Sequence, residues 1–297
     1  MSDLLGPMPP TPDVGPVAVD AGHLEPVAPG VWAWIGTDRD GRPGPNAGVV
    51  VEDDGITLVD ALAAPTVARA LNQSLTRFGV PVRRLVYTSS HVASVGGSAV
   101  FWMAARYGRP QTSTLLDQPV PLDAYRRLVP DHAAEFDERF QTRPVSHTID
   151  QAAWLTPAVC AVPVAGHQEQ NLVVLVPSAG LCFAGAMVAS GVTPNAYDGD
   201  PEAWADTLGE LADQAQVIVP GTGPVGDAST LAVQQAYLYA VTDAAGDPRR
   251  IPDGPWDEWS QRDLDEVNVE RAARLAAGDD GVPASMLRRL GLAGPDS

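Results

Sequence analysis

A single histidine stands among small polar residues in the segment VYTSSHVASVGG, at residues 86–97. The apolar run that ends at Thr88 predicts a strand, and the paired glycines predict the start of a helix. Catalytic side chains of α/β proteins often lie in loops that follow strand ends. His91 could carry out acid–base chemistry near neutral pH, and Ser89 and Ser94 offer hydroxyl groups beside it. No GxSxG turn surrounds these serines, so hydrogen bonding is favoured over a serine nucleophile.

Strand and helix patterns alternate on both sides of this loop. VVV and ITLV flank a DDG turn, which predicts a β-hairpin over residues 46–61. Apolar residues at helical spacing over 64–79 end at Gly79, a typical helix cap. The other expected elements are strands at 30–36 and 83–88, a helix at 98–108, a short strand near 111–116, a helical stretch at 121–141 broken by Pro130, strands from residue 147, a helix at 201–214, a strand at 217–221 and helices from residue 229.

Two strand-rich blocks separated by helices predict an α/β protein with two sheets and helices outside them. No change in composition and no long linker separates the two blocks. We therefore expect a single domain over residues 17–297, with a helical C-terminal extension from about residue 229. Residues 1–16 are rich in proline and glycine and are expected to form a flexible tail.

The composition limits the partners that the protein can have. The net charge is -18, the sequence pI is about 4.4, and all 19 basic residues are arginine. Nucleic acids and anionic membranes need a basic surface, so neither is an expected partner, whereas a small-molecule substrate is. No apolar run is long enough to span a membrane, and the first residues lack a signal-peptide pattern. We expect a cytoplasmic protein, and a homodimer is compatible with the sequence.

The order of these segments resembles the metallo-β-lactamase fold family over roughly residues 30–240. The segments that carry the resemblance are NAGVVVEDDGITLVDA, VRRLVYTSSHVASVGGSAVF, VAGHQEQNLVVLVPSAGLCFAGAMV and VIVPGTGPVGD. The corresponding family motifs are THxHxDHxGG in the second segment, GHxxxN and LFxGD in the third, and PGHG in the fourth. The resemblance implies an αββα four-layer sandwich of two mixed β-sheets, and the family consists largely of metal-dependent hydrolases.

The residues at the family's metal-ligand positions have largely changed. The resemblance places these positions at Ser89, His91, Ala93, Ser94, His167, Ala186 and Thr222. Two histidines remain, while serine, alanine and threonine do not replace zinc ligands. We therefore expect no dinuclear zinc centre and no cofactor. One zinc ion on the two histidines, completed by water and an unidentified carboxylate, is the metal-containing alternative.

The replacements are all smaller than the ligands they replace, which predicts a wider and nearly uncharged cleft. We expect the five changed positions to contact the substrate instead of a metal: Ser89, Ala93, Ser94, Ala186 and Thr222. The resemblance implies supporting roles for Asp60, which would steady the loop of His91, and for Asn171, which would fix the loop of His167.

The resemblance implies that the rings of His91 and His167 face each other. Two adjacent imidazoles are not protonated together at low cost, so one would remain a free base near neutral pH. We therefore favour a metal-independent enzyme that uses this pair for acid–base catalysis: hydrolysis of an ester or thioester, or an elimination, isomerisation or cyclisation in a biosynthetic pathway. The alternatives are a non-catalytic binding or assembly protein, in which loop hydrogen bonds merely satisfy the histidines, and a mononuclear metallohydrolase.

Overall fold

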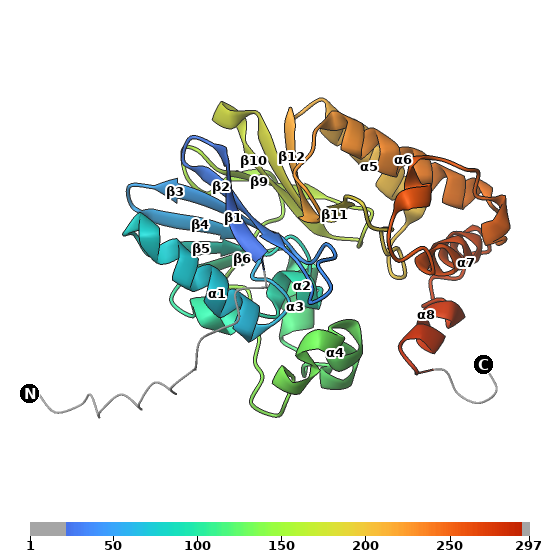
Figure 1. Cartoon of the computed structure of the whole chain (residues 1–297), viewed down its shortest axis with the longest axis horizontal. Helices are drawn as coiled ribbons and strands as arrows, with labels where there is room; N and C mark the ends of the chain where they lie inside the picture. The colour runs from blue at the N-terminus through green and yellow to red at the C-terminus, as the bar shows by residue number, and fades with distance from the viewer. Residues whose placement is uncertain (1–21, 293–297) are drawn as a thin grey trace, which may run out of the picture.

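The computed structural model describes residues 22–292, and the expected flexible tail at residues 1–16 lies outside them. The first of two mixed β-sheets has seven strands in sequential order (Figure 1). Its first four strands are antiparallel neighbours, and the remaining ones continue in parallel. The strands are β1 (Gly22–Ala28), β2 (Val31–Gly36), β3 (Ala47–Glu52), β4 (Gly55–Val59), β5 (Val82–Val86), β6 (Ala105–Gly108) and β7 (His147–Thr148).

The second sheet has five strands in the order β12-β11-β10-β9-β8. Its two last strands in the sequence, β11 and β12, pair in parallel, and the other neighbours are antiparallel. The strands are β8 (Ala153–Trp154), β9 (Cys160–Val164), β10 (Asn171–Val176), β11 (Leu181–Ala189) and β12 (Val217–Thr222).

Helices cover the outer face of each sheet, as Figure 1 shows for α1 on one side and for α5 and α6 on the other. The α-helices are α1 (Pro65–Leu75), α2 (Val92–Val95), α3 (Pro110–Leu116), α4 (Leu122–Leu128), α5 (Pro201–Ala212), α6 (Ala228–Asp243), α7 (Leu264–Ala276) and α8 (Ala284–Arg289). The short 3-10 helices are η1 (Thr76–Phe78), η2 (Ser98–Phe101), η3 (Pro130–Glu135), η4 (Pro177–Ala179), η5 (Pro248–Arg250) and η6 (Pro255–Glu258). This arrangement confirms the predicted four-layer αββα sandwich. No described helix has the length and apolar character that crossing a membrane requires.

Three apolar cores hold the four layers together. Between the sheets, Val50 and Val86 of the first pack in one cluster with Leu172 and Phe183 of the second. The two sheets approach closely at Gly48, because a Cβ atom on this residue would lie 2.4 Å from the ring of Phe183. A second core joins α1 to the outer face of the first sheet.

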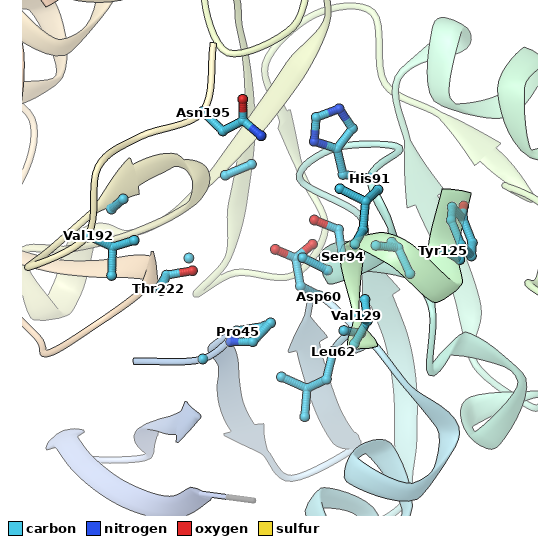
Figure 2. Close-up of a pocket in the computed structure, with 18 of the residues that line it drawn as sticks. Pro45, Asp60, Leu62, His91, Ser94, Tyr125, Val129, Val192, Asn195 and Thr222 are labelled. Carbon is cyan, nitrogen blue, oxygen red and sulfur yellow. The ribbon is translucent and has the colours of Figure 1, made fainter. Parts of the chain in front are cut away.

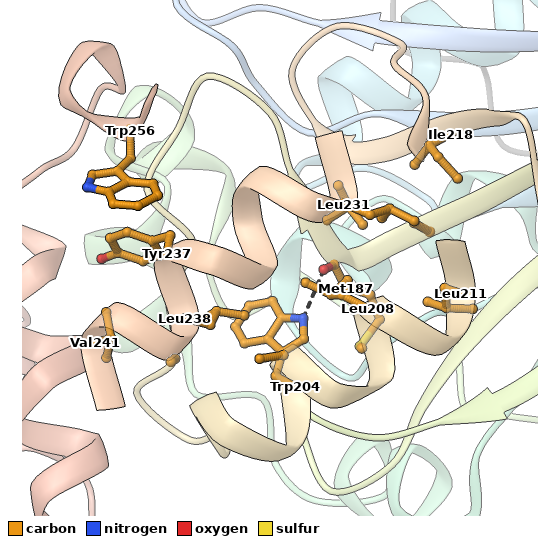
Figure 3. Packing of buried hydrophobic residues seen from close by; sticks show 14 of the residues in the cluster. Met187, Trp204, Leu208, Leu211, Ile218, Leu231, Tyr237, Leu238, Val241 and Trp256 are labelled. Carbon is orange, nitrogen blue, oxygen red and sulfur yellow. Dashed lines mark hydrogen bonds between the residues drawn. The ribbon is translucent and has the colours of Figure 1, made fainter. Parts of the chain in front are cut away.

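The third core lies between the second sheet and helices α5 and α6 (Figure 3). Its largest fully buried side chain is Trp204, whose indole N–H donates a hydrogen bond to the carbonyl of Met187 (2.9 Å). Leu208 of α5 and both Leu231 and Leu238 of α6 complete the contact. Trp204 therefore anchors α5 to β11 through both apolar contact and a hydrogen bond.

Two elements differ from their sequence-based prediction, and a third, β1, lies outside the predicted elements altogether. The segment 98–108, predicted as a helix, is the short η2 followed by β6, because Ala105 and its neighbours pair with β5. Sheet pairing thus outweighs the helical spacing of its apolar residues. The segment 111–116, predicted as a strand, belongs to α3, where Pro110 occupies the first turn and favours a helix start.

Candidate active site

A pocket of about 920 Å³ opens where β4, β5, β11 and β12 end. The strands of each pair run in parallel, so their carboxyl ends bring four loops to one edge of the sandwich. Figure 2 shows Val192 and Thr222 on one side of the pocket and Leu62, Val129 and Tyr125 on the other. The volume falls at the upper end of the range typical of small-molecule sites.

The loop of His91 is held by close backbone packing. His91 directly precedes the four-residue helix α2. A Cβ atom on Gly96 would lie 1.9 Å from the carbonyl oxygen of Ala63, so only glycine fits there. Beneath this contact, Asp60 and Leu62 both adopt φ values of 64°. Left-handed backbone at non-glycine residues costs free energy and is concentrated at functional sites.

A buried chain of hydrogen bonds lies beneath the His91 loop. Asp60 accepts hydrogen bonds from the backbone N–H of Thr88 (2.8 Å) and from its hydroxyl (2.6 Å). The hydroxyl of Ser94 lies 3.3 Å from that of Thr88 and 2.9 Å from that of Ser89. Burial raises the pKa of Asp60 to about 6, although the bonds from Thr88 and Ser94 oppose the shift. Asp60 thus bonds to the strand end that precedes the loop, and its supporting role for His91 stays a prediction.

These hydrogen bonds limit the contacts that Ser89 and Ser94 can make with a substrate. Ser89 is fully buried, lies behind the pocket wall and accepts a bond from the backbone N–H of His91 (3.3 Å). Ser94 lines the pocket but is 2% exposed. Ala93, Ala186 and Thr222 line the pocket as well. The small residues therefore shape the cavity, while the serine hydroxyls are bonded to each other.

His91 is paired with a carboxylate that the sequence analysis did not identify. Its Nε2 atom lies 3.0 Å from Oδ2 of Asp198 and 3.1 Å from the hydroxyl of Tyr197, whose ring stacks on the imidazole. Burial would raise the pKa of Asp198, but His91, His167 and a bond from Gln168 outweigh it and hold the pKa at about 2. Asp198 is therefore ionised at neutral pH, and Nε2 of His91 carries the donated proton.

The two predicted histidines are in contact, with ring centroids 4.6 Å apart and an interplanar angle of 69°. His167 is 6% exposed and meets the ring of Trp204 edge-on at 5.2 Å. Burial, reinforced by the neighbouring His91, lowers the pKa of His167 to about 3. His167 is therefore neutral near pH 7.

Asn171 and Gln168 link the two histidine loops. Asn171 accepts a bond from the backbone N–H of Gln168 (2.7 Å) and donates to the carbonyl of Thr88 (3.2 Å). The side chain of Gln168 bonds both to Ser90 and to Asp198. The loop-fixing role that the resemblance implied for Asn171 agrees with these contacts.

The donors in this pocket do not fit the zinc centre that the resemblance would imply. Ala93 and Ala186 carry no donor atom, Ser89 and Ser94 bond to each other, and Nε2 of His91 is engaged by Asp198. Between residues 22 and 292, no group of three or more His, Cys, Asp or Glu side chains has a geometry suited to a metal ion. The absence of a cofactor nevertheless remains a prediction.

Tyr197 and Asp198 are the site residues that sequence reasoning missed. They lie in the loop between β11 and α5, just before Asp200, which caps α5 by accepting bonds from Glu202 and Ala203. The local sequence does not distinguish Asp198 from an acidic residue that caps α5, as Asp200 does. The position of Asp198 beside His91 depends on a contact across 107 residues, which no short motif records.

No protein-family model matches the chain. Solved structures do match it at low sequence identity. The metallo-β-lactamase FIM-1 from Pseudomonas aeruginosa, in its mono-zinc form, is 20% identical with a TM-score of 0.59, over 75% of this chain and 98% of that one. A metallo-β-lactamase from Erythrobacter litoralis is 20% identical with a TM-score of 0.57, over 74% and 96% of the two chains. The metallo-β-lactamase DIM-1 is 18% identical with a TM-score of 0.58, over 73% and 97%. The chain therefore has the metallo-β-lactamase fold that its motifs indicated.

Proposed function

We propose that the protein is a metal-independent enzyme in which His91 removes a proton from a small organic substrate. The observation that carries this proposal is the 3.0 Å contact between Nε2 of His91 and Asp198 at a pocket of about 920 Å³. The reaction class it supports best is an elimination, isomerisation or cyclisation, because each begins with proton abstraction.

The roles of the two nitrogens of His91 follow from their contacts. The ionised Asp198 accepts a hydrogen bond from Nε2–H, so the lone pair of the neutral imidazole lies on Nδ1. Within the described residues, Nδ1 has no hydrogen-bond partner. Nδ1 is therefore the atom that takes the substrate proton, and Asp198 stabilises the imidazolium that forms. A carboxylate that orients an imidazole in this way is a recurrent device of acid–base catalysis.

The proposed role of His167 differs from that of His91, although the sequence analysis treated the two histidines as one acid–base pair. A histidine whose pKa is about 3 is a weak base, so it does not compete for the substrate proton at neutral pH. Its neutral ring instead hydrogen-bonds the substrate and keeps a second positive charge away from His91. A covalent serine intermediate is not part of the proposal, because the hydroxyls of Ser89 and Ser94 are buried and bonded to each other.

The proposal is tested with 5-nitrobenzisoxazole, a neutral aromatic compound that opens to a coloured phenolate when a base removes one carbon-bound proton. The metal-stripped protein should open it faster than an equal concentration of imidazole. Because a positioned base contributes about 10²–10⁴-fold, His91→Ala should lower the rate at least about a hundredfold. The matched control is His23→Gln on the exposed strand β1, which should keep the wild-type rate.

Two outcomes would contradict the proposal. A wild-type rate no greater than that of imidazole would instead favour the non-catalytic binding protein. A rate that vanishes on chelation and returns with zinc would favour the mononuclear metallohydrolase.

A further inference from the structure

We infer that the pocket selects a neutral, mainly apolar organic molecule and rejects anionic ones. This inference rests on the proposed function in that it names the substrate class of the same pocket. It is tested by binding alone, so that its failure and the failure of the catalytic proposal give different results.

Apolar side chains form most of the pocket lining, and they come from both halves of the fold. Leu62 and Val92 lie on the side of the first sheet, and Val188 and Val192 lie on the side of the second. A ligand that covers these side chains removes apolar surface from water, which stabilises the complex. The metal ligands of the resembling family would have made this surface polar.

Two helical segments extend the apolar surface toward solvent. Leu128 and Val129, at the end of α4, face the pocket from one side, and Leu264 and Leu290 face it from the C-terminal helices. The two segments are joined, because the guanidinium of Arg127 donates a hydrogen bond to the carbonyl of Leu290. The two segments therefore form adjoining apolar walls of the same open pocket.

The cations at the pocket already have partners. Three arginines line it within residues 22–292, and each is engaged by this chain. Arg42 pairs with Asp40 (3.3 Å), Arg127 donates to Leu290, and Arg289 pairs with Asp263. The carboxylates of Asp40 and Asp263 already neutralise Arg42 and Arg289, which leaves Arg127, bonded to a neutral carbonyl oxygen, as the one lining arginine of the described residues without a paired anion.

Acidic groups oppose an anionic ligand directly. Four aspartates line the pocket: Asp38, Asp60, Asp131 and Asp198. Asp198 is ionised beside His91 at the polar end, and the net charge of the chain is -18. A buried anion without a counterion is strongly disfavoured, so charge selects against carboxylates, sulfonates and phosphates.

The experiment uses two fluorescent probes that differ in one sulfonate group. N-phenyl-1-naphthylamine is neutral, and 8-anilinonaphthalene-1-sulfonate is its anionic counterpart. We expect one neutral probe to bind per chain, and the anionic probe to bind at least about tenfold more weakly, because it brings an unpaired charge into the pocket. Titrations at about 0.5 M salt remove the long-range effect of the net charge, and the preference should persist there.

Variants locate the bound probe. Val129→Trp on the α4 side and Ala93→Phe on α2 both fill the pocket from different elements, and each should weaken binding of the neutral probe at least about tenfold. Met103→Ser is the matched control, because Met103 is 77% exposed and lies outside the pocket lining. It should leave probe binding unchanged.

His91→Ala separates this inference from the catalytic proposal. It should lower the rate of 5-nitrobenzisoxazole opening at least about a hundredfold while the neutral probe still binds. If the neutral probe binds and the wild type has no activity, the catalytic proposal fails and the ligand class holds. Equal binding of both probes, or loss of binding in Met103→Ser with retention in both filled variants, would overturn the ligand class.

Discussion

The buried neutral state of His167 predicts a measurable dependence of stability on pH. In the folded protein burial lowers the pKa of this residue to about 3, whereas the ordinary value of 6.5 applies to the unfolded chain. Between these two pH values, the unfolded chain binds a proton that the folded protein does not. The free energy of unfolding therefore rises as the pH increases across this window. As the pH falls through the window, the contribution of His167 to stability decreases.

The magnitude follows from the two pKa values. Each pKa unit corresponds to about 1.4 kcal/mol, so His167 contributes about 5 kcal/mol of pH-dependent stability over the whole window. Acidification from pH 7 to pH 4.5 should remove about 3 kcal/mol of it. Asp60 acts in the opposite direction, because burial raises its pKa to about 6 and its protonation favours the folded state. Its contribution cancels when a variant of His167 is compared with the wild type.

Urea denaturation of the wild type, His167→Gln and His167→Leu at pH 7, 5.5 and 4.5 measures the effect. Both variants lack the titrating ring, so each should gain about 3 kcal/mol relative to the wild type between pH 7 and 4.5, whatever its packing cost at pH 7. Two replacements of different polarity separate the titration from the loss of contacts with Trp204. A wild-type-to-variant difference that stays constant over this pH range would refute the argument that His167 is buried in the neutral form.

Three further substitutions test other parts of the account. Asp198→Asn should lower the rate of 5-nitrobenzisoxazole opening at least about tenfold while the neutral probe still binds, because it removes the charge that stabilises the His91 imidazolium; an unchanged rate would remove Asp198 from the mechanism. Trp204→Ala should lower the free energy of unfolding by about 3–5 kcal/mol in urea, since it empties the core between α5 and β11; a loss below 1 kcal/mol would contradict that packing. Asn46→Ala should cost about 3 kcal/mol in the same assay, because the Asn46 side chain makes three buried hydrogen bonds to Gly36, Pro220 and Gly223; wild-type stability would show that these bonds are replaceable.

Local patterns were sufficient to predict most of the fold. The DDG turn fixes the hairpin of β3 and β4, and Gly96 and Gly97 stand where a Cβ atom would clash with the backbone oxygens of Ala63 and Ala61. The exceptions are β1, which was not predicted, and residues 98–116, where a strand and a helix were exchanged. There the apolar spacing was ambiguous, and the pairing of Ala105 with β5 decided the structure.

The candidate site was predictable only in part. The contact between His91 and His167 followed from the family resemblance, and so did the supporting positions of Asp60 and Asn171. The pairing of Asp198 with His91 did not, because a carboxylate from a distant loop has no fixed spacing from its partner. The burial that makes His167 neutral also arises from tertiary packing against Trp204, which the sequence around His167 does not record.

The central claim is that the site performs acid–base chemistry without a metal ion. The most direct test measures, on the same untagged sample, metal content by elemental analysis and the rate of 5-nitrobenzisoxazole opening, before and after chelation and after addition of zinc. We predict a rate that depends on His91 and stays constant while the metal content falls well below one ion per chain. A rate that rises and falls in proportion to bound zinc would contradict the account.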